Sequence, residues 1–227
     1  MILLAIDTSG KNGSIALARA PESARHSSEL NILDVVPLEG GTFSAQLVPQ
    51  IAALLAKHGL SKNDIGAFAV ASGPGSFTGV RVGLAAIKAF AEILQKPIAA
   101  ISLLEAVARS GQDRGRVIAA LDAGRGDVYA GIYHIEEAAK MHAERLLTNA
   151  ELFAEAAGDL IVTPDARLAE AARTAGVQVN QVLLARSDTI ARLGWEKIQK
   201  GEIISPEDLE ANYIRRSDAE IFPKPRK

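Results

Sequence analysis

The chain has 227 residues, of which 48% are hydrophobic and 23% charged, as in a globular protein of one large or two small domains. Its formal net charge is −2, whereas proteins that bind nucleic acid without a partner usually carry an excess of basic residues. It has no cysteine, which excludes disulfides, thiolate metal sites and a cysteine nucleophile. No apolar run approaches the length of a membrane span, and Asp7 ends the apolar start of the chain, so we expect a cytoplasmic protein.

The first half is predicted to open with three strands and to continue with alternating helices and strands. The strands are expected at residues 3–7, 13–19, 30–36, 67–71 and 98–101. The helices are expected at 44–57, at 79–94 and from Ser102, where Ser102 and Glu105 have the spacing of a capping box.

The second half repeats this order. Its strands are expected at residues 117–122, 127–135, 141–147, 160–162 and 181–184. Its helices are expected from Asn149, at 165–174 and at 187–200, where Trp195 is predicted to belong to the core.

The two halves also open alike, with LAIDTSGKNGSIAL in the first and AALDAGRGDVYAGI in the second. Each is an apolar strand that ends in Asp, followed by a glycine-rich hairpin and a second apolar strand. An internal repeat constrains topology strongly. The pattern βββαβαβα, present twice, predicts an α/β fold of the actin-like ATPase (ASKHA) type. The polar stretch 110–116 divides it into an N-terminal lobe, 1–111, and a C-terminal lobe with an extended tail, 116–227.

The stretch GPGSFTGVRVG, residues 73–83, lies where a phosphate-binding loop would be expected. It lacks the Lys-Ser/Thr of a P-loop, and its glycines miss the dinucleotide-binding spacing by one residue. Amide groups at a helix N-terminus still attract anions, whereas glycines and a proline also suit a plain strand-to-helix turn. We weigh the turn above a weak phosphate site, whose candidate residues are Asp7, Ser9, Gly10, Gly73, Gly75 and Ser76.

Other catalytic arrangements are not supported by the sequence. The four histidines do not pair at helical spacing, and no serine has an evident base partner. Asp7 and Asp122 end the first strand of each half, where phosphate-handling carboxylates would sit in an actin-like ATPase, but each can simply cap its own turn. We therefore expect no metal and no tightly bound cofactor, and a nucleotide remains open.

The helices at 44–57 and 79–94 are apolar around more of their circumference than one sheet can cover. A helix resting on a sheet needs an apolar arc of about 100°, whereas the second of these helices has roughly twice that. The excess predicts either packing of the two helices on each other or a surface covered by a partner chain. The predicted interface residues are Leu47, Ile51, Leu54, Val80, Gly83, Ile87 and Phe90.

Five segments resemble the TsaB (YeaZ) family over nearly the whole chain. They are LAIDTS, FSAQLVPQIAALL, ASGPGSFTGVRVGLAAIKAFA, LDAGRGDVYAGIY and NYIRRSDAE. The resemblance implies an actin-like fold and a role in making N6-threonylcarbamoyladenosine (t6A) in tRNA. It further implies a non-catalytic scaffold that pairs with the catalytic subunit TsaD through N-lobe helices and is joined by the ATPase TsaE.

The same resemblance marks where this chain departs from its relatives. TsaD-like proteins carry a His-x-x-x-His metal pair where this chain has Leu103 and Val107, so a catalytically inactive paralogue is implied. Many relatives have His-Ser where this chain has Phe43-Ser44. Contact with tRNA is expected only within the complex, through Arg215, Arg216 and a tail that contains Lys224, Arg226 and Lys227.

Three functions remain in competition. A scaffold predicts no activity alone and a stable complex with TsaD, with a homodimer through the same helices as a further expectation. An actin-like ATPase or small-molecule kinase predicts binding of Mg-ATP near Asp7 and Asp122. A glycoprotease-type peptidase predicts chelator-sensitive cleavage, against which the missing histidine pair argues.

Overall fold

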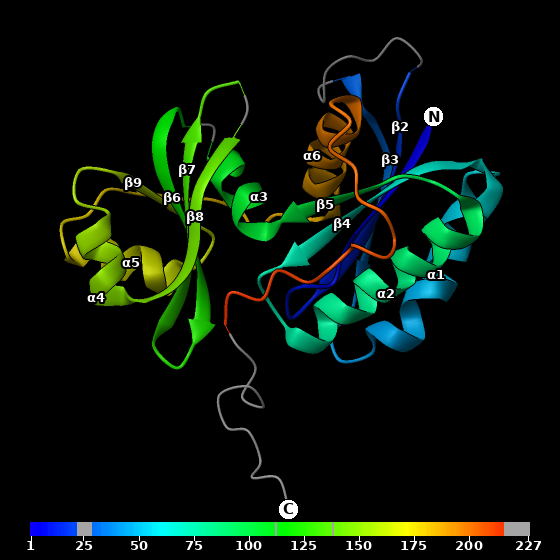
Figure 1. The fold of residues 1–227 in the computed structure, drawn as a ribbon. Helices are drawn as coiled ribbons and strands as arrows, with labels where there is room; N and C mark the ends of the chain where they lie inside the picture. Colours follow the sequence, from blue (N-terminus) through cyan, green and yellow to red (C-terminus); the bar gives the residue numbers. More distant parts are fainter. Residues whose placement is uncertain (22–28, 112, 138, 216–227) are drawn as a thin grey trace, which may run out of the picture.

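The computed structural model describes residues 1–21, 29–111, 113–137 and 139–215. Its strands form two five-stranded mixed sheets, one in each of two lobes that stand side by side (Figure 1). The lobes meet at α3 and along the last part of the chain, which passes between them (Figure 1).

The first sheet has the order β3-β2-β1-β4-β5. Its strands alternate between two faces, so Leu4 and Ile6 point into one apolar cluster while Leu3 and Ala5 point into another. The first cluster is covered by the helices α1 (Phe43–Lys57) and α2 (Phe77–Leu94). The strands are β1 (Ile2–Asp7), β2 (Gly13–Arg19), β3 (Asn31–Leu38), β4 (Ile65–Gly73) and β5 (Ile98–Ser102), and a short 3₁₀ turn, η2 (Lys62–Asp64), precedes β4.

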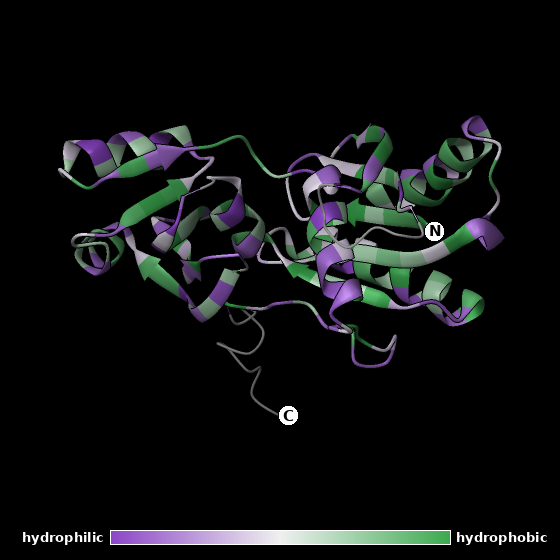
Figure 2. Ribbon diagram, turned by 90° about the horizontal axis from the view of Figure 1, so that it is seen from above, coloured by the Kyte–Doolittle hydropathy of each residue, from purple (hydrophilic) through white to green (hydrophobic). Residues whose placement is uncertain are grey.

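The second sheet has the order β10-β9-β6-β7-β8, which is the order of the first sheet with each strand replaced by its counterpart in the second half. Its strands are β6 (Gly115–Gly124), β7 (Asp127–Ile135), β8 (Ala139–Thr148), β9 (Leu160–Thr163) and β10 (Val179–Gln181). Leu152 of α4 (Asn149–Glu155) and Leu168 of α5 (Ala166–Thr174) fill one apolar cluster on this sheet. Seen from above, the strands of both lobes are largely hydrophobic (Figure 2).

The last helix of each half contacts the sheet of the other half, and α3 lies against both sheets, because its Leu103 and Ala106 belong to the apolar cluster on the first sheet. The helix α3 (Leu103–Ser110) places Leu104 and Val107 against Val117 and Tyr133 of the second sheet. The helix α6 (Ser187–Gln199) covers the free face of the first sheet with side chains that include Ile190 and Trp195, both buried. The division into 1–111 and 116–227 therefore separates the two sheets but not the two lobes.

The segment that follows α6 stays on the first lobe, and we call it the C-terminal strap, residues 202–215. Ile204 forms an isolated antiparallel bridge with Ile98 at the start of β5. The amide of Asn212 donates to the carbonyl of Ser72 at 2.8 Å. The strap thus continues along the first lobe and reaches the gap between the lobes (Figure 1).

Most predicted elements are confirmed within two residues, and the exceptions have local causes. The second helix starts at Phe77, two residues earlier than predicted, because the side chain of Ser76 accepts from the amide of Gly79 and caps it. The last strand lies at 179–181 and not at 181–184, and the apolar residues Leu183 and Leu184 that suggested it are exposed. Within the described residues, no helix is both long and apolar enough to span a bilayer.

Candidate functional site

The glycine loop joins β4 to α2 and lies directly against the first hairpin. The amide of Ser76 donates to the carbonyl of Ser9 at 2.7 Å, and the hydroxyl of Thr8 donates to the carbonyl of Gly79 at 2.7 Å. A Cβ on Gly75 would lie 2.3 Å from the carbonyl oxygen of Ser9, and one on Gly79 would lie 2.1 Å from that of Thr8. These two glycines are therefore required by close backbone packing.

Gly73 has a different role, which is to turn the chain. Its φ of +106° is a conformation that side chains rarely adopt, and it precedes Pro74. This geometry supports the interpretation of the loop as a strand-to-helix turn.

Asp7 and Ser9, two residues of the predicted phosphate site, face into the protein. Only 5% of Asp7 is exposed, and its Oδ1 accepts from the amide of Ser9 at 2.9 Å and from the Ser9 hydroxyl at 2.6 Å. Burial raises the pKa of the Asp7 carboxyl, although the two hydrogen bonds oppose that effect. The carboxyl is thus used to close its own turn.

The remaining residues of the predicted phosphate site lie in two different places. Gly10 and Ser76 line a hollow of about 480 Å³ beside the N-terminal end of α1, together with Phe43. Gly75 instead lines the cavity between the lobes. Phe43, where the resemblance implies a histidine in many relatives, is 7% exposed and belongs to the core under α1 and α2.

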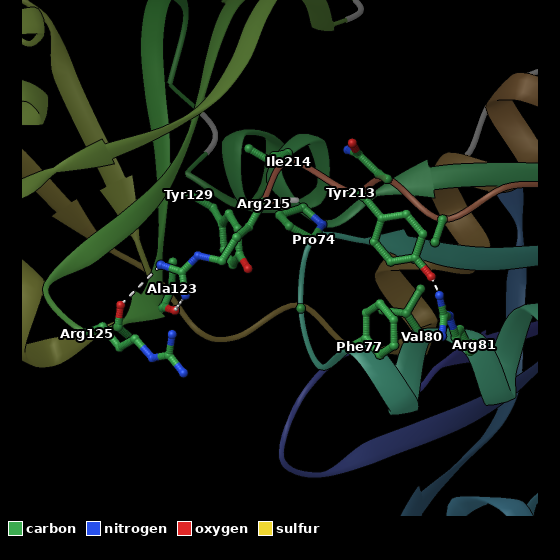
Figure 3. Close-up of a pocket in the computed structure, with 14 residues that line it drawn as sticks. Pro74, Phe77, Val80, Arg81, Ala123, Arg125, Tyr129, Tyr213, Ile214 and Arg215 are labelled. Atoms are coloured by element: carbon green, nitrogen blue, oxygen red, sulfur yellow. Dashed lines mark hydrogen bonds between the residues drawn. The ribbon is translucent and has the colours of Figure 1, made fainter. Parts of the chain in front are cut away.

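The cavity between the lobes, which we call the inter-lobe cavity, has a volume of about 760 Å³. Phe77, Val80 and Arg81 of α2 form one wall, and Arg125 and Tyr129 belong to the opposite wall (Figure 3). The strap closes it with residues 211–215.

Phe77, Arg81 and Tyr213 form a compact cluster on the first-lobe side. The guanidinium of Arg81 lies 3.5 Å from the centre of the Phe77 ring, and its Nε donates to the Tyr213 hydroxyl at 2.6 Å. The Phe77 and Tyr213 rings are 5.5 Å apart between centres. Contacts of this kind between a cation and aromatic faces are attractive, so the three side chains hold one another in place.

On the second-lobe side, Arg215 anchors the end of the strap. Its guanidinium donates to the carbonyl of Ala123 at 3.0 Å (Figure 3). It also pairs with Asp127 at 2.5 Å. Arg215, one of the predicted tRNA contacts, therefore has a structural role, because it joins the strap to the hairpin between β6 and β7. Arg216 and the tail residues Lys224, Arg226 and Lys227 lie outside the described residues.

The second hairpin carries Asp122, which the sequence left open between a catalytic and a turn role. Its Oδ1 accepts from the amide of Gly124 at 2.9 Å, as the turn interpretation predicts. Arg125 follows with a φ of +60°, which places its side chain at the hairpin tip facing the cavity (Figure 3).

The predicted partner-interface residues are mostly internal, and this requires a correction. Gly83 faces the sheet, where an added Cβ would lie 2.5 Å from the hydroxyl oxygen of Thr8. Phe90 is only partly buried and stacks on Phe68 of β4 with 6.2 Å between ring centres. Those buried in the first-lobe core are Leu47, Ile51, Leu54, Val80 and Ile87.

The wide apolar arcs therefore have two parts, an inner one that packs in this chain and an outer one that remains exposed. Val48 is 53% exposed and Ile93 is 72% exposed. Phe77 is exposed too, but it lines the inter-lobe cavity. The other exposed apolar positions of the two helices, which with Val48 and Ile93 make nine, are alanines and a proline, namely Ala45, Pro49, Ala52, Ala53, Ala56, Ala85 and Ala89. We call these nine positions the outer face of α1 and α2.

The start of α3, where the resemblance places a lost histidine pair, is aliphatic. Leu103 and Val107 are buried. Ser102 caps the helix by accepting from the amide of Leu104, but the predicted capping box is wrong, because Glu105 pairs with Lys197 at 2.9 Å. Among the residues that the structure describes, no three histidine or carboxylate side chains gather as a metal site would require.

Sequence reasoning missed the aromatic and basic lining of the inter-lobe cavity. Arg81 and Tyr213 are 132 residues apart, so no local pattern joins them. The one local signal was Phe77, a large apolar residue at the first position of a helix and outside its inward stripe.

A family model described as "TsaD: tRNA N6-adenosine threonylcarbamoyltransferase" matches residues 35–154. The chain is 36% identical over 134 residues to the tRNA threonylcarbamoyladenosine biosynthesis protein TsaB of Bacillus subtilis, covering 59% of this chain and 55% of that protein. It is 27% identical over 234 residues to the protein of the same name from Escherichia coli, covering 96% of each. The chain thus spans about half of the first relative and nearly all of the second.

Two solved structures from Pseudomonas aeruginosa are similar to this one throughout. The first, an uncharacterized protein with similarity to peptidase YEAZ, superposes with a TM-score of 0.73 at 26% identity, covering 94% of this chain and 99% of that chain. The second, YeaZ, has a TM-score of 0.71 at 24% identity, covering 93% of this chain and 99% of that chain.

Proposed function

Because this chain belongs to the TsaD family and, within it, to the TsaB (YeaZ) proteins of tRNA threonylcarbamoyladenosine biosynthesis, we propose that it is a non-catalytic subunit of the t6A-synthesising complex. In this proposal it pairs with a catalytic TsaD subunit, receives the ATPase TsaE, and meets tRNA only within the assembly. It needs no tightly bound cofactor and works in the cytoplasm. Its two lobes derive from duplication of one actin-like βββαβαβα unit.

The outer face of α1 and α2 is the observation that carries this proposal. Lys57 is the only charged residue of α1, and it stands at the end of the helix. Ala45, Val48 and Ala52 are spaced so that they lie on one side of α1, and Ala85, Ala89 and Ile93 are spaced likewise on α2. Apolar helical surface with small side chains lets another helix approach closely, which is typical of a protein–protein interface.

The interior of the same lobe favours this proposal over an ATPase or kinase. Asp7 and Ser9 bond each other beneath the surface, so they are turned away from a nucleotide in the cavity. Leu103 and Val107 offer no metal ligand where the resemblance places a histidine pair, which weighs against a metallopeptidase as well. Glu105 is neutralised by Lys197.

The proposal is tested by size-exclusion chromatography with light scattering on the full chain, alone and mixed with the TsaD of the same organism. The variants are Val48→Glu and Ile93→Glu, which put a charge on the outer face without touching the core. Leu183→Glu is the matched control, because Leu183 is an exposed leucine in the second lobe and is 89% exposed. Gly83→Arg is unsuitable, because its side chain would push apart α2 and β1.

We expect a one-to-one complex for the wild type and the control, and at least about a tenfold loss of affinity for each outer-face variant, since an unpaired charge in a buried interface costs more than 1.4 kcal/mol. The mass of the chain alone tests the homodimer, which the same variants would dissociate. If the wild type does not bind TsaD, or if both outer-face variants bind as it does, the proposed role of this face is wrong.

A further inference from the structure

The inter-lobe cavity has a charge that contrasts with that of the whole chain. Among the described residues its lining contains three arginines, Arg81, Arg125 and Arg215, and no aspartate or glutamate, and Arg215 is paired with Asp127 outside that lining. The whole chain carries a formal net charge of −2. Concentration of arginine in one cavity of an acidic protein favours an anionic ligand.

The cavity also presents aromatic rings at its rim. Phe77 is 45% exposed and Tyr213 is 47% exposed, although both rings have a partner on one side. Arg81 fixes them through the Phe77 ring and the Tyr213 hydroxyl. Exposed rings that are already immobilised cost little entropy when a planar group stacks on them.

Arg125 adds a cation to the opposite wall, and its backbone adopts a conformation that is unfavourable for a residue with a side chain. It occupies the left-handed region with a φ of +60°, between two glycines that adopt positive φ more easily. A side chain kept in this conformation at a cavity is a reason to look for a ligand. In Figure 3 the Arg125 guanidinium lies across the cavity from Phe77 and Arg81.

We propose that the inter-lobe cavity binds a nucleotide of single-stranded RNA, with the base stacked on the Phe77 and Tyr213 rings and the phosphates facing Arg81 and Arg125. This inference rests on the proposed function, to which it adds an RNA-binding site on this subunit. A volume of about 760 Å³ lies within the range of small-ligand sites. The combination of aromatic platforms with arginine is the chemistry by which proteins hold unpaired nucleotides.

The cavity favours a strand of RNA over a free nucleotide with magnesium for two reasons. The part of the lining that the structure describes supplies no carboxylate for a metal, and the Asp7 carboxyl is closed into its own turn. Phe77 and Tyr213 are each almost half exposed, so a ligand that stacks on them can extend from the cavity into solvent.

The site is tested on the full chain by fluorescence anisotropy with a labelled tRNA anticodon stem–loop. Unlabelled AMP and a blunt RNA duplex serve as competitors. Tyr213→Ser removes the ring, whereas Tyr213→Phe keeps it and loses only the hydroxyl. Arg125→Asp reverses one charge with a residue that tolerates positive φ, and Arg167→Asp makes the same charge change at an exposed site on α5.

We expect saturable binding of the stem–loop that weakens as salt rises. Tyr213→Ser should weaken it at least about fivefold, which corresponds to the loss of one stacked base. Arg125→Asp should weaken it by a similar factor, whereas Arg167→Asp should bind within twofold of the wild type. Tyr213→Phe, which keeps the ring but loses the bond that fixes it, should fall between the wild type and Tyr213→Ser.

Several results would overturn the inference. One is an unchanged affinity in both Tyr213→Ser and Arg125→Asp, and another is no binding by the wild type. Equal competition by the duplex would show binding by charge alone, and competition by AMP at the concentration of the stem–loop would assign the cavity to a free nucleotide. Association of the same variants with TsaD is measured in parallel. Loss of RNA binding with normal TsaD binding would concern the cavity alone, and loss of TsaD binding with normal RNA binding would concern the scaffold role alone.

Discussion

Glu144 on β8 is expected to fasten the two lobes and the strap together. Its carboxylate accepts from the hydroxyl of Ser102 at the start of α3, from the hydroxyl of Tyr133 on β7, and from the side-chain amide of Asn212 on the strap. Burial and the neighbouring Glu144 carboxylate both raise the pKa of the Tyr133 hydroxyl. Tyr133 therefore remains a hydrogen-bond donor at any ordinary pH. We predict that Glu144→Gln loosens this junction while it preserves the shape of the side chain.

The magnitude follows from the number and kind of hydrogen bonds. A bond to a charged acceptor contributes about 1.5–3 kcal/mol and a neutral one about 1 kcal/mol, so removal of the charge weakens each of three bonds by about 0.5–2 kcal/mol. The new amide group also meets the donor of Asn212 unless that side chain turns over. Because Glu144 is only partly buried, the lower part of the range applies, and the expected loss is about 2 kcal/mol.

The assay is urea unfolding of the full chain, combined with hydrogen exchange of the strap. The backbone amide of Asn212, which donates to the carbonyl of Ser72, should exchange its hydrogen faster in Glu144→Gln than in the wild type. Glu170→Gln serves as the control, since the Glu170 side chain is exposed and only loosely paired with Arg173. An unchanged unfolding midpoint together with unchanged exchange at Asn212 would refute the view that this carboxylate joins the lobes.

Two further predictions concern the first hairpin. Gly79→Ala should cost about 2 kcal/mol in urea unfolding, because its Cβ must displace the Thr8 carbonyl, and Thr78→Ala next to it should change stability by less than about 0.5 kcal/mol. If Gly79→Ala is as stable as the wild type, the loop does not lie against the hairpin as described. Since the pKa of Asp7 is raised in the folded chain, the wild type should lose stability relative to Asp7→Asn as the pH rises above about 3.9. Urea midpoints of both proteins between pH 4 and 7 measure this difference, and the opposite trend would contradict a carboxyl dominated by burial.

The fold could be predicted well where a local pattern has one physical solution. The strand at 127–135 begins after a glycine turn and stays rich in β-branched, aromatic and small apolar residues through to Ile135, and its bounds are those of β7. The apolar run QVLL, at 181–184, does not determine one structure, because a short apolar run fits a strand or a loop equally well. Leu183 and Leu184 are in fact exposed.

The sequence could predict how much of α1 and α2 is apolar but not which part faces inward. The helical wheel gives the width of an apolar arc, and Val80 and Ile87 are as apolar as Val48 and Ile93. Which of them is buried depends on where β1 and β4 lie, which only the folded chain shows. The residues first assigned to a partner were for this reason mainly the core residues of the same arc.

The inter-lobe cavity could not be predicted from the sequence, because its walls come together only when the chain passes from the first lobe to the second and back. The chain enters the second sheet through α3, returns to the first through α6, and then lays the strap across the gap. Tyr213 reaches Arg81 only as a result of that path. The same path separates two surfaces, an apolar outer face that suits a protein partner and a basic, aromatic cavity that suits an anionic one. The proposed scaffold role would use both, since its contribution is to hold other molecules in place.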